Sequence, residues 1–264
     1  MRDRYAVVGN PVAHSNSPWI HAEFARATGH ELDYGRIEAP LDGFERTVDG
    51  FRAAGGKGLN VTLPFKEAAF RYCKSVSTRA AAAQAVNTLA FDDAVFGDNT
   101  DGAGLVADLN NNLGLSLGGK TVLLMGAGGA AQGVVQALLE AGAARLVIAN
   151  RTVAKAEALA ARFGVTAGPY EALGDQAFDV VINATSAGLS NQAPGLPASV
   201  LQRAGLAYDM VYGRDTPFLA MARAAGTRGC DGLGMLVEQA AESFLIWRGV
   251  RPETRSVLER LRAA

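Results

Sequence analysis

The segment that most constrains the fold is an apolar run followed at once by a glycine-rich turn. The run is TVLLM at 121–125, the turn is GAGGAA at 126–131, and an apolar helix-forming stretch continues to Ala141. A strand, a glycine turn and a helix in this order are typical of a dinucleotide-binding βαβ unit. The same pattern also occurs as a tight strand-to-helix connection that binds no ligand.

Strand-like and helical patterns alternate along the whole chain, which predicts an α/β fold with largely parallel strands. The predicted strands are 5–8, 33–37, 58–61, 121–125, 146–149, 178–182 and 206–210, with a hairpin turn at 92–95. The predicted helices are 18–28, 41–54, two short ones after Pro64 and Ser77, one ending at Ala141, 153–163, 216–225, 235–248 and a short one after Pro252.

Composition narrows the function classes. The 264 residues suffice for two domains, and 25 Lys and Arg against 26 Asp and Glu argue against an electrostatic nucleic-acid or membrane-surface partner. No apolar run reaches the ~20 residues of a bilayer span, and no signal peptide is recognisable, so we expect a cytoplasmic protein.

Cys73 and Cys230 are far apart and predict reduced thiols. His14, His21 and His30 show no metal-ligand spacing, so we expect no metal.

The strand after the glycine turn indicates which dinucleotide fits. It ends in Asn150-Arg151-Thr152, where NAD-specific folds usually place an acidic residue for the ribose 2′-hydroxyl. Arg151 and, one turn later, Lys155 can instead bind a 2′-phosphate. This favours NADP(H), the alternative being that Arg151 is a solvated loop charge.

Four polar clusters in the first half lie at strand ends or helix starts, where open α/β sheets bind ligands. They are HSNSP at 14–18, NVTLPFK at 60–66, Asn87-Thr88 and GDNTDG at 97–102. Ser17 before Pro18 also fits an ordinary helix N-cap, whereas Ser15 is not needed for a cap. Together the two hydroxyls form a neutral cradle for a carboxylate.

Two charged residues in these clusters are candidates for acid–base chemistry. Lys66 is expected in the first turn of a helix, where the dipole disfavours a cation, so a functional ammonium is preferred over a solvated one. Asp101 directly precedes a predicted helix, and Asp98 lies in the same loop. Either aspartate also fits a turn or an N-cap.

Nine segments, taken in order, resemble the shikimate dehydrogenase family. They are GNPVAHSNSP, GGKGLNVTLPFK, AVNTL, GDNTDG, MGAGGAA, NRT, INATSAG, DMVY and DGLGMLVEQAA. The resemblance covers essentially the whole chain. It implies an N-terminal α/β substrate domain at 1–102 completed by helices in 235–264, a Rossmann-like NADP-binding domain at 103–234, and an active site in the cleft between them.

The resemblance also implies an activity: NADPH-linked reversible reduction of 3-dehydroshikimate to shikimate, in aromatic amino acid biosynthesis. The partners expected are this small-molecule substrate and NADP(H), without nucleic acid or membrane. The sequence does not determine the oligomeric state, and a homodimer is one option.

The family's functional positions carry over residue by residue. Lys66 and Asp101 match its catalytic pair. The substrate-contacting positions are Ser15, Ser17, Thr62, Asn87, Asp101, Tyr212 and Gln239. The cofactor positions are Gly126, Ala127, Gly128, Gly129, Ala130, Asn150, Arg151, Thr152, Lys155, Met210 and Gly232. Thr78 stands where some members have an acidic cofactor contact, so it is not included.

Other functions remain open at this point. One is a quinate/shikimate dehydrogenase-like relative with another cyclic hydroxy acid or an aminated analogue as substrate. Another is a non-catalytic NADP-binding protein on the same fold, which the joint presence of Lys66 and Asp101 disfavours. A third is a tetrahydrofolate-linked dehydrogenase, which the Ser15 and Ser17 pair disfavours.

Overall fold

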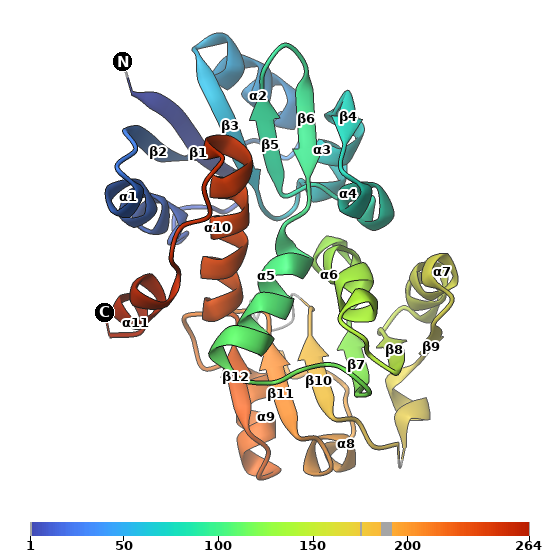
Figure 1. The fold of residues 1–264 in the computed structure, drawn as a ribbon. Coiled ribbons are helices and arrows are strands. Elements are labelled where there is room, and N and C mark those ends of the chain that lie inside the picture. Colours follow the sequence, from blue (N-terminus) through green and yellow to red (C-terminus); the bar gives the residue numbers. More distant parts are fainter. Residues whose placement is uncertain (1, 175, 186–191, 264) are drawn as a thin grey trace. The chain divides into compact units, whose positions relative to one another are not determined.

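The computed structural model describes residues 2–174, 176–185 and 192–263 (Figure 1). The chain divides into two compact units. The first joins Met1–Gly104 to Leu236–Ala264, and the second is Leu105–Met235. Each unit contains its own six-stranded sheet. The predicted α/β class is confirmed.

The sheet of the first unit has the strand order β2-β1-β3-β5-β6-β4. Its strands are β1 (Asp3–Gly9), β2 (Leu32–Glu38), β3 (Gly56–Val61), β4 (Ser75–Val76), β5 (Thr88–Phe91) and β6 (Val95–Asp98). β1 pairs in parallel with β2 and β3, whereas β5 runs antiparallel to β3 and β6. The predicted turn therefore joins the β5–β6 hairpin, and β5 runs antiparallel to the other strands of the sheet.

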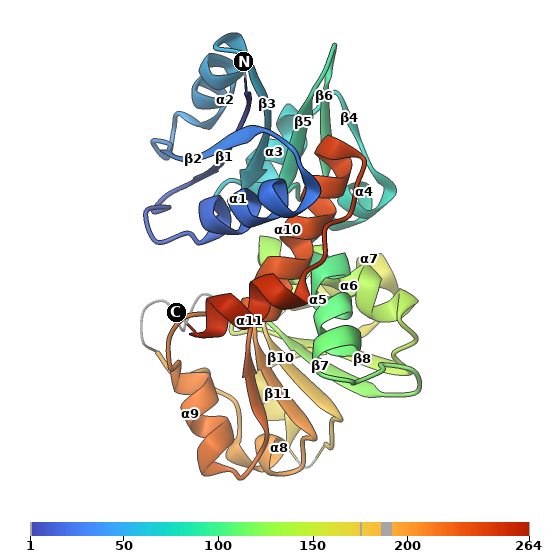
Figure 2. The same cartoon turned by 60° about the vertical axis from the view of Figure 1, so that its left-hand side comes forward.

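The helices of the first unit cover both faces of this sheet. They are α1 (Ser17–Thr28), α2 (Phe44–Ala53), α3 (Lys66–Tyr72), α4 (Thr78–Ala83), α5 (Asp101–Ala107), α10 (Leu233–Arg248) and α11 (Arg255–Ala263), and α5 and α10 each cross the boundary between the units. The apolar residues Ala6 and Val8 of β1 pack in a core with α2, α3 and α4. α1 packs against β1 and β2 (Figure 2).

The opposite face of the same sheet holds a mixture of aromatic and polar side chains. Strand side chains alternate between faces, so Tyr5 points away from the core of Ala6. Its partner across the sheet is Tyr34 of β2. In the same way, Asn60 of β3 is paired with Thr88 of β5 and shares this face.

Helix α10 lies against this polar face through Trp247. The Trp247 ring stacks on Tyr5 with 4.6 Å between ring centroids, and its Nε1 donates to the carbonyl of Leu89 at 2.9 Å. A Cβ at Gly58 would lie 2.4 Å from Trp247 Nε1, so this close approach requires glycine. The polar side chains of β3 and β5 are thereby enclosed between sheet and helix.

The second unit is a fully parallel sheet in the order β12-β11-β10-β7-β8-β9. Its strands are β7 (Thr121–Met125), β8 (Arg145–Ala149), β9 (Thr166–Gly168), β10 (Val180–Asn183), β11 (Leu206–Asp209) and β12 (Gly229–Asp231). Counted from β7, this order is 6-5-4-1-2-3, the doubly wound order of dinucleotide-binding folds.

The helical elements of the second unit connect these strands. They are α6 (Gly129–Glu140), α7 (Val153–Phe163), α8 (Ala198–Gln202), α9 (Pro217–Ala224), a π-helical turn at Asp108–Asn112 and a 3₁₀ turn at Tyr170–Leu173. Among the described helices of the chain, none is long and apolar enough to cross a membrane.

Candidate active site

Lys66 and Asp101 form a close ion pair in the first unit. Lys66 is the first residue of α3 and Asp101 the first of α5, and Lys66 Nζ lies 2.5 Å from Asp101 Oδ2. Their side chains are 15% and 7% exposed, so Lys66 is not a solvated surface lysine. The N–H of Asp101 donates to Asn99 Oδ1 at 3.1 Å, so the Asn99 side chain is an acceptor at the start of α5.

Asn87 is the second donor to Asp101. Its Nδ2 donates to Asp101 Oδ1 at 2.9 Å, so each carboxylate oxygen accepts from a different side chain. On its other side, Asn87 Oδ1 accepts from the Thr100 N–H at 2.8 Å and from Thr88 Oγ1 at 2.9 Å. All these residues except Lys66 are buried. The amide of Asn87 is therefore held in one orientation.

Gln239 reaches the same cluster from α10. Its Oε1 lies 3.4 Å from both Asn87 Nδ2 and Thr100 Oγ1, and its Nε2 donates to the Leu236 carbonyl at 2.7 Å. A Cβ at Gly104 would lie 2.6 Å from the Cβ of Gln239. Gly104, one turn after Asp101, thus lets α5 approach α10 closely. This glycine is the feature of the sequence that could have indicated the contact with Gln239.

The N-cap expected at Ser17 is wrong. The N-cap is Asn16 without a side-chain cap, and Ser17 is already the first helical residue. Ser15 Oγ accepts from the Ser17 N–H at 3.3 Å and donates to Ser17 Oγ at 3.1 Å, so Ser15 does take part in the helix start. The Arg36 guanidinium holds the Ser15 carbonyl at 2.6 Å and 3.0 Å. Both serines are buried, at 7% and 5% exposed.

Two further predicted substrate contacts are Thr62 and Tyr212. Thr62 follows β3 and is half-buried, and its N–H donates to the Val8 carbonyl at 2.9 Å. A Cβ at Gly9 would lie 2.4 Å from the Thr62 methyl group. Tyr212 belongs to the second unit, where it follows β11 and is half-buried.

Asp98 has a different role from the turn or cap considered above. Arg79 of α4 binds both of its carboxylate oxygens, with two nitrogen–oxygen distances of 2.8 Å. Ser77 and the Asn99 N–H donate to the same carboxylate. Burial acts to raise the pKa of Asp98, but the hydrogen bonds from Arg79 and Ser77 outweigh it, and the pKa is lowered.

The glycine turn of the second unit has the geometry of a phosphate site. Gly126 has a φ of +110°, and a Cβ there would lie 3.0 Å from the Ala184 carbonyl oxygen at the end of β10. The first backbone bond of α6 runs from the Gln132 N–H to the Gly128 carbonyl at 2.9 Å. Helix N–H groups before that point have no carbonyl partner in the helix, and they suit an anion at the point where the strand order reverses.

The predicted 2′-phosphate residues follow β8. Asn150 Nδ2 donates to the Thr152 carbonyl at 2.9 Å, which shapes the turn into α7. Arg151 and Lys155 are exposed, and neither forms an ion pair with the described residues. Their charges are therefore accessible to a phosphate.

Met210 and Gly232 contact each other in the second unit. A Cβ at Gly232 would lie 2.4 Å from the Met210 carbonyl oxygen, so glycine is required for this approach. In the family-like segment INATSAG, residues 186–188 lie outside the described residues. Within the described part of the chain, no group of three or more His, Cys, Asp or Glu could hold a metal ion.

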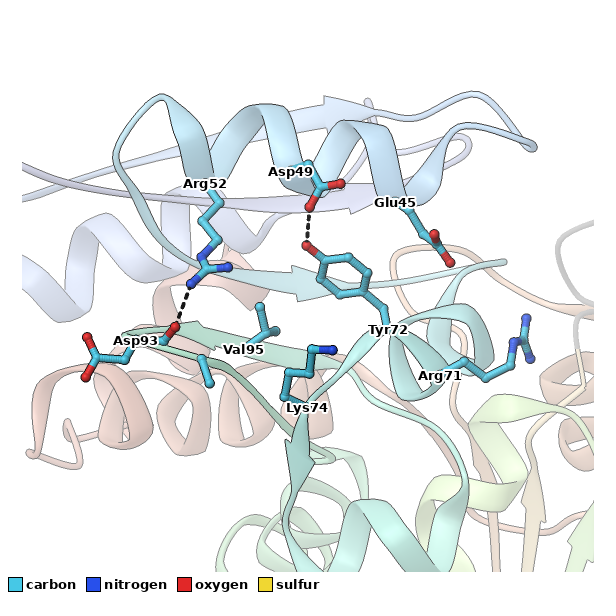
Figure 3. Close-up of a pocket in the computed structure, with 9 residues that line it drawn as sticks. Glu45, Asp49, Arg52, Arg71, Tyr72, Lys74, Asp93 and Val95 are labelled. Atoms are coloured by element: carbon cyan, nitrogen blue, oxygen red, sulfur yellow. Dashed lines mark hydrogen bonds between the residues drawn. The ribbon is translucent and has the colours of Figure 1, made fainter.

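A separate hollow of about 560 Å³ lies in the first unit between α2, α3 and the β5–β6 turn (Figure 3). Its charged lining residues are Glu45, Asp49, Asp93, Arg52, Arg71 and Lys74. Tyr72 donates to Asp49 at 2.5 Å, and Arg52 donates to the Asp93 carbonyl at 3.0 Å. The two signs balance, and none of the predicted site residues lines this hollow.

Comparison with known proteins identifies the family. The substrate-binding domain of shikimate dehydrogenase matches residues 7–89, the shikimate/quinate 5-dehydrogenase domain matches 108–192, and the shikimate 5′-dehydrogenase C-terminal domain matches 232–262. The chain belongs to the shikimate dehydrogenase family. A shikimate dehydrogenase (NADP(+)) of Aromatoleum aromaticum is 58% identical over 98% of this chain and 97% of its own length.

Solved structures extend this similarity to three dimensions. An Ael1 enzyme from Pseudomonas putida is 51% identical, with a TM-score of 0.93 over 98% of both chains. A shikimate 5-dehydrogenase from Thermus thermophilus, solved with NADP(H) and shikimate, is 38% identical, with a TM-score of 0.89 over 99% of both chains. The family predicted from the sequence is confirmed.

Proposed function

We propose that this chain catalyses the NADP-linked, reversible reduction of 3-dehydroshikimate to shikimate. The observation that carries the proposal is the Lys66–Asp101 ion pair, in which Asp101 is buried beside the polar side chains of Asn87 and Gln239. Two relatives named shikimate dehydrogenase (NADP(+)) are 58% and 56% identical over 98% and 99% of this chain. The first unit is the substrate domain and the second the cofactor domain.

The proton chemistry is assigned to Lys66. Reduction of a ketone adds a hydride to carbon and a proton to oxygen, and bound NADP(H) supplies the hydride. Lys66 Nζ donates a hydrogen bond and then the proton to the substrate oxygen. Asp101 holds Lys66 in place through Oδ2 and offers Oδ1, together with Asn87, to a neighbouring substrate hydroxyl.

The substrate carboxylate is assigned to the hydroxyls of Ser15, Ser17 and Tyr212. A set of neutral hydroxyls can satisfy an anion without the cost of burying an unpaired cation. Thr62 and Gln239 provide further hydroxyl and amide groups for the ring hydroxyls. Thr78, the first residue of α4, is not assigned a role.

NADP(H) is assigned to the second unit. The phosphates are held by the backbone at Gly126–Ala130, and the 2′-phosphate by Asn150–Thr152 and Lys155. Met210 and Gly232 complete the site. We place the enzyme in the cytoplasm, as a step of aromatic amino acid biosynthesis.

The test is absorbance at the reduced-nicotinamide band with purified protein, shikimate or quinate, and NADP or NAD. We expect rapid reduction of NADP with shikimate. The reaction should be much slower with shikimate and NAD, and with quinate and either cofactor. Turnover with quinate alone would reassign the substrate, and a preference for NAD would overturn the role of Arg151. Absence of turnover with all four would favour a non-catalytic NADP-binding protein.

The variant Lys66→Ala tests the catalytic assignment. We expect kcat to fall by ~10² or more with NADP affinity nearly unchanged, as for loss of a general acid. The matched control is Lys57→Ala, because Lys57 is an exposed lysine on β3 of the same unit. Loss of NADP binding with turnover retained would refute the assignment.

A further inference from the structure

A row of hydrogen bonds crosses the polar face of the first sheet and ends at the catalytic pair. The Tyr34 hydroxyl donates to Asn60 Oδ1 at 2.7 Å, and Asn60 Nδ2 donates to Thr88 Oγ1 at 3.2 Å. Thr88 Oγ1 donates to Asn87 Oδ1 at 2.9 Å, and Asn87 Nδ2 donates to Asp101. Tyr34, Asn60 and Thr88 come from β2, β3 and β5, Asn87 directly precedes β5, and Asp101 begins α5.

Backbone groups fix the direction of this row. The Thr100 N–H can only donate, and it lies 2.8 Å from Asn87 Oδ1, so the NH₂ group of Asn87 faces Asp101. The Asn87 carbonyl can only accept, and Asn60 Nδ2 lies 3.3 Å from it. Neither amide can therefore be rotated by 180° without placing two donors or two acceptors in contact.

Tyr34 is the group that satisfies the far end of this row. Because the NH₂ group of Asn60 faces the Asn87 carbonyl, Thr88 and Ser243, its Oδ1 must accept, and the Tyr34 hydroxyl is its donor. Burial raises the pKa of Tyr34 well above 10, which a hydrogen bond from Ser17 only partly opposes, so the hydroxyl keeps its proton.

The Tyr34 ring is itself held by packing. His21 of α1 stacks on it with ring centroids 4.3 Å apart and an interplanar angle of 6°. His21 is fully buried, and burial lowers its pKa to about 3, so this neighbour stays neutral at working pH. Tyr34 thus has a fixed ring and one available donor.

We propose that Tyr34 is a positioning residue for the reaction, because its hydroxyl orients Asn60 and, through Thr88, presents the Asn87 amide to Asp101. This inference rests on the proposed role of Lys66 and Asp101. Tyr34 itself is not assigned a contact with substrate or cofactor.

The experiment compares Tyr34→Phe with Tyr5→Phe. Both changes remove one hydroxyl from a largely buried ring on the same sheet face, and Tyr5 lies outside the row, with Arg248 at 3.5 Å as its partner. We expect kcat/KM for shikimate to fall about tenfold in Tyr34→Phe, as for one lost hydrogen bond, and to change less than twofold in Tyr5→Phe. The dissociation constant for NADP should be the same in both variants.

A second pair of variants tests the connection through Thr88. Thr88→Val keeps the shape but loses the hydroxyl, whereas Thr88→Ser keeps the hydroxyl. We expect Thr88→Val to lose activity and Thr88→Ser to retain most of it. Tyr34→Phe combined with Thr88→Val should be little worse than Thr88→Val alone, because one row has already been broken.

Two results would overturn the inference. One is an equal kcat/KM in Tyr34→Phe and Tyr5→Phe. The other is a loss of kcat/KM in the double variant that equals the product of the two single losses. Lys66→Ala is measured alongside to separate this inference from the proposed function. If Lys66→Ala retains turnover, the proposed function fails, whereas if it loses turnover and Tyr34→Phe does not, only the role of Tyr34 fails.

Discussion

Replacing Arg79 by glutamine should destabilise the first unit in a pH-dependent way. Arg79 binds both oxygens of Asp98 and lies 3.6 Å from Glu242 of α10. Breaking a buried ion pair typically costs about 3–5 kcal/mol, and an exposed pair is worth about 0–1 kcal/mol. Asp98 is 7% exposed but Arg79 is 35% exposed, so we expect a loss of about 2 kcal/mol at neutral pH.

The sign of the pH dependence follows from Asp98. Burial acts to raise its pKa, but Arg79 and Ser77 lower the pKa below the ordinary value of 3.8. The ion pair therefore contributes fully above about pH 5, and the contribution is lost as the pH falls through the folded-state pKa. The difference in unfolding free energy between wild type and Arg79→Gln should shrink as the pH falls below about 5 and through the lowered pKa of Asp98.

Urea denaturation followed by circular dichroism measures this difference. His21 also makes stability depend on pH, but it is present in both proteins and cancels in the comparison. The control Arg255→Gln removes a pair whose side chains are 82% and 66% exposed, and it should change stability by less than about 0.5 kcal/mol. Adding Asp98→Asn to Arg79→Gln should recover stability, because the unpaired buried charge is removed. A constant difference across pH, or additive losses in the double variant, would refute the reasoning.

Two further predictions concern the second unit. Gly232→Ala places a Cβ 2.4 Å from the Met210 carbonyl oxygen and should lower the unfolding free energy by about 1–3 kcal/mol. The control Gly168→Ala, whose Cβ would have its nearest neighbour at 4.0 Å, should change the unfolding free energy little. Thermal denaturation of the two variants checks this. Arg151→Asp should weaken NADP binding at least about tenfold more than NAD binding, because it sets a carboxylate against the 2′-phosphate. Arg228→Asp, at another exposed arginine, is the control. Equal losses of affinity for both cofactors in a fluorescence titration would contradict the prediction.

The long elements were predictable because their patterns extend over several turns or alternations. The strand 121–125 and the helix 153–163 have the predicted limits. The helix predicted from Leu41 begins at Phe44, and Leu41 is 73% exposed, so its apolar character does not mark a buried face. The strands β4, β9 and β12 have only two or three residues, which is too short for a period of two to be recognised.

The polar clusters were visible in the sequence, but their connections were not. Asp98 fitted a turn or cap, and nothing in the local sequence indicated that Arg79, 19 residues earlier, binds it in two places. Tyr34 and Asn60 are 26 residues apart in the sequence, and they come close because β2 and β3 are both neighbours of β1. Such contacts depend on strand order, which sequence periodicity does not determine. The roles assigned to Lys66 and Asp101 remain predictions until the variants are measured.

The helix dipoles act differently on the two members of the Lys66–Asp101 ion pair. Both residues begin a helix, α3 and α5, where the peptide dipoles stabilise an anion and destabilise a cation. Asp101 is therefore favourably placed alone, whereas Lys66 depends on its partner. Removing the charge of Asp101 should displace the Lys66 ammonium more than loss of Lys66 displaces Asp101, since Asn87 still binds the carboxylate. The pair is thus anchored from the aspartate side, through a row of amides that is fixed by backbone groups.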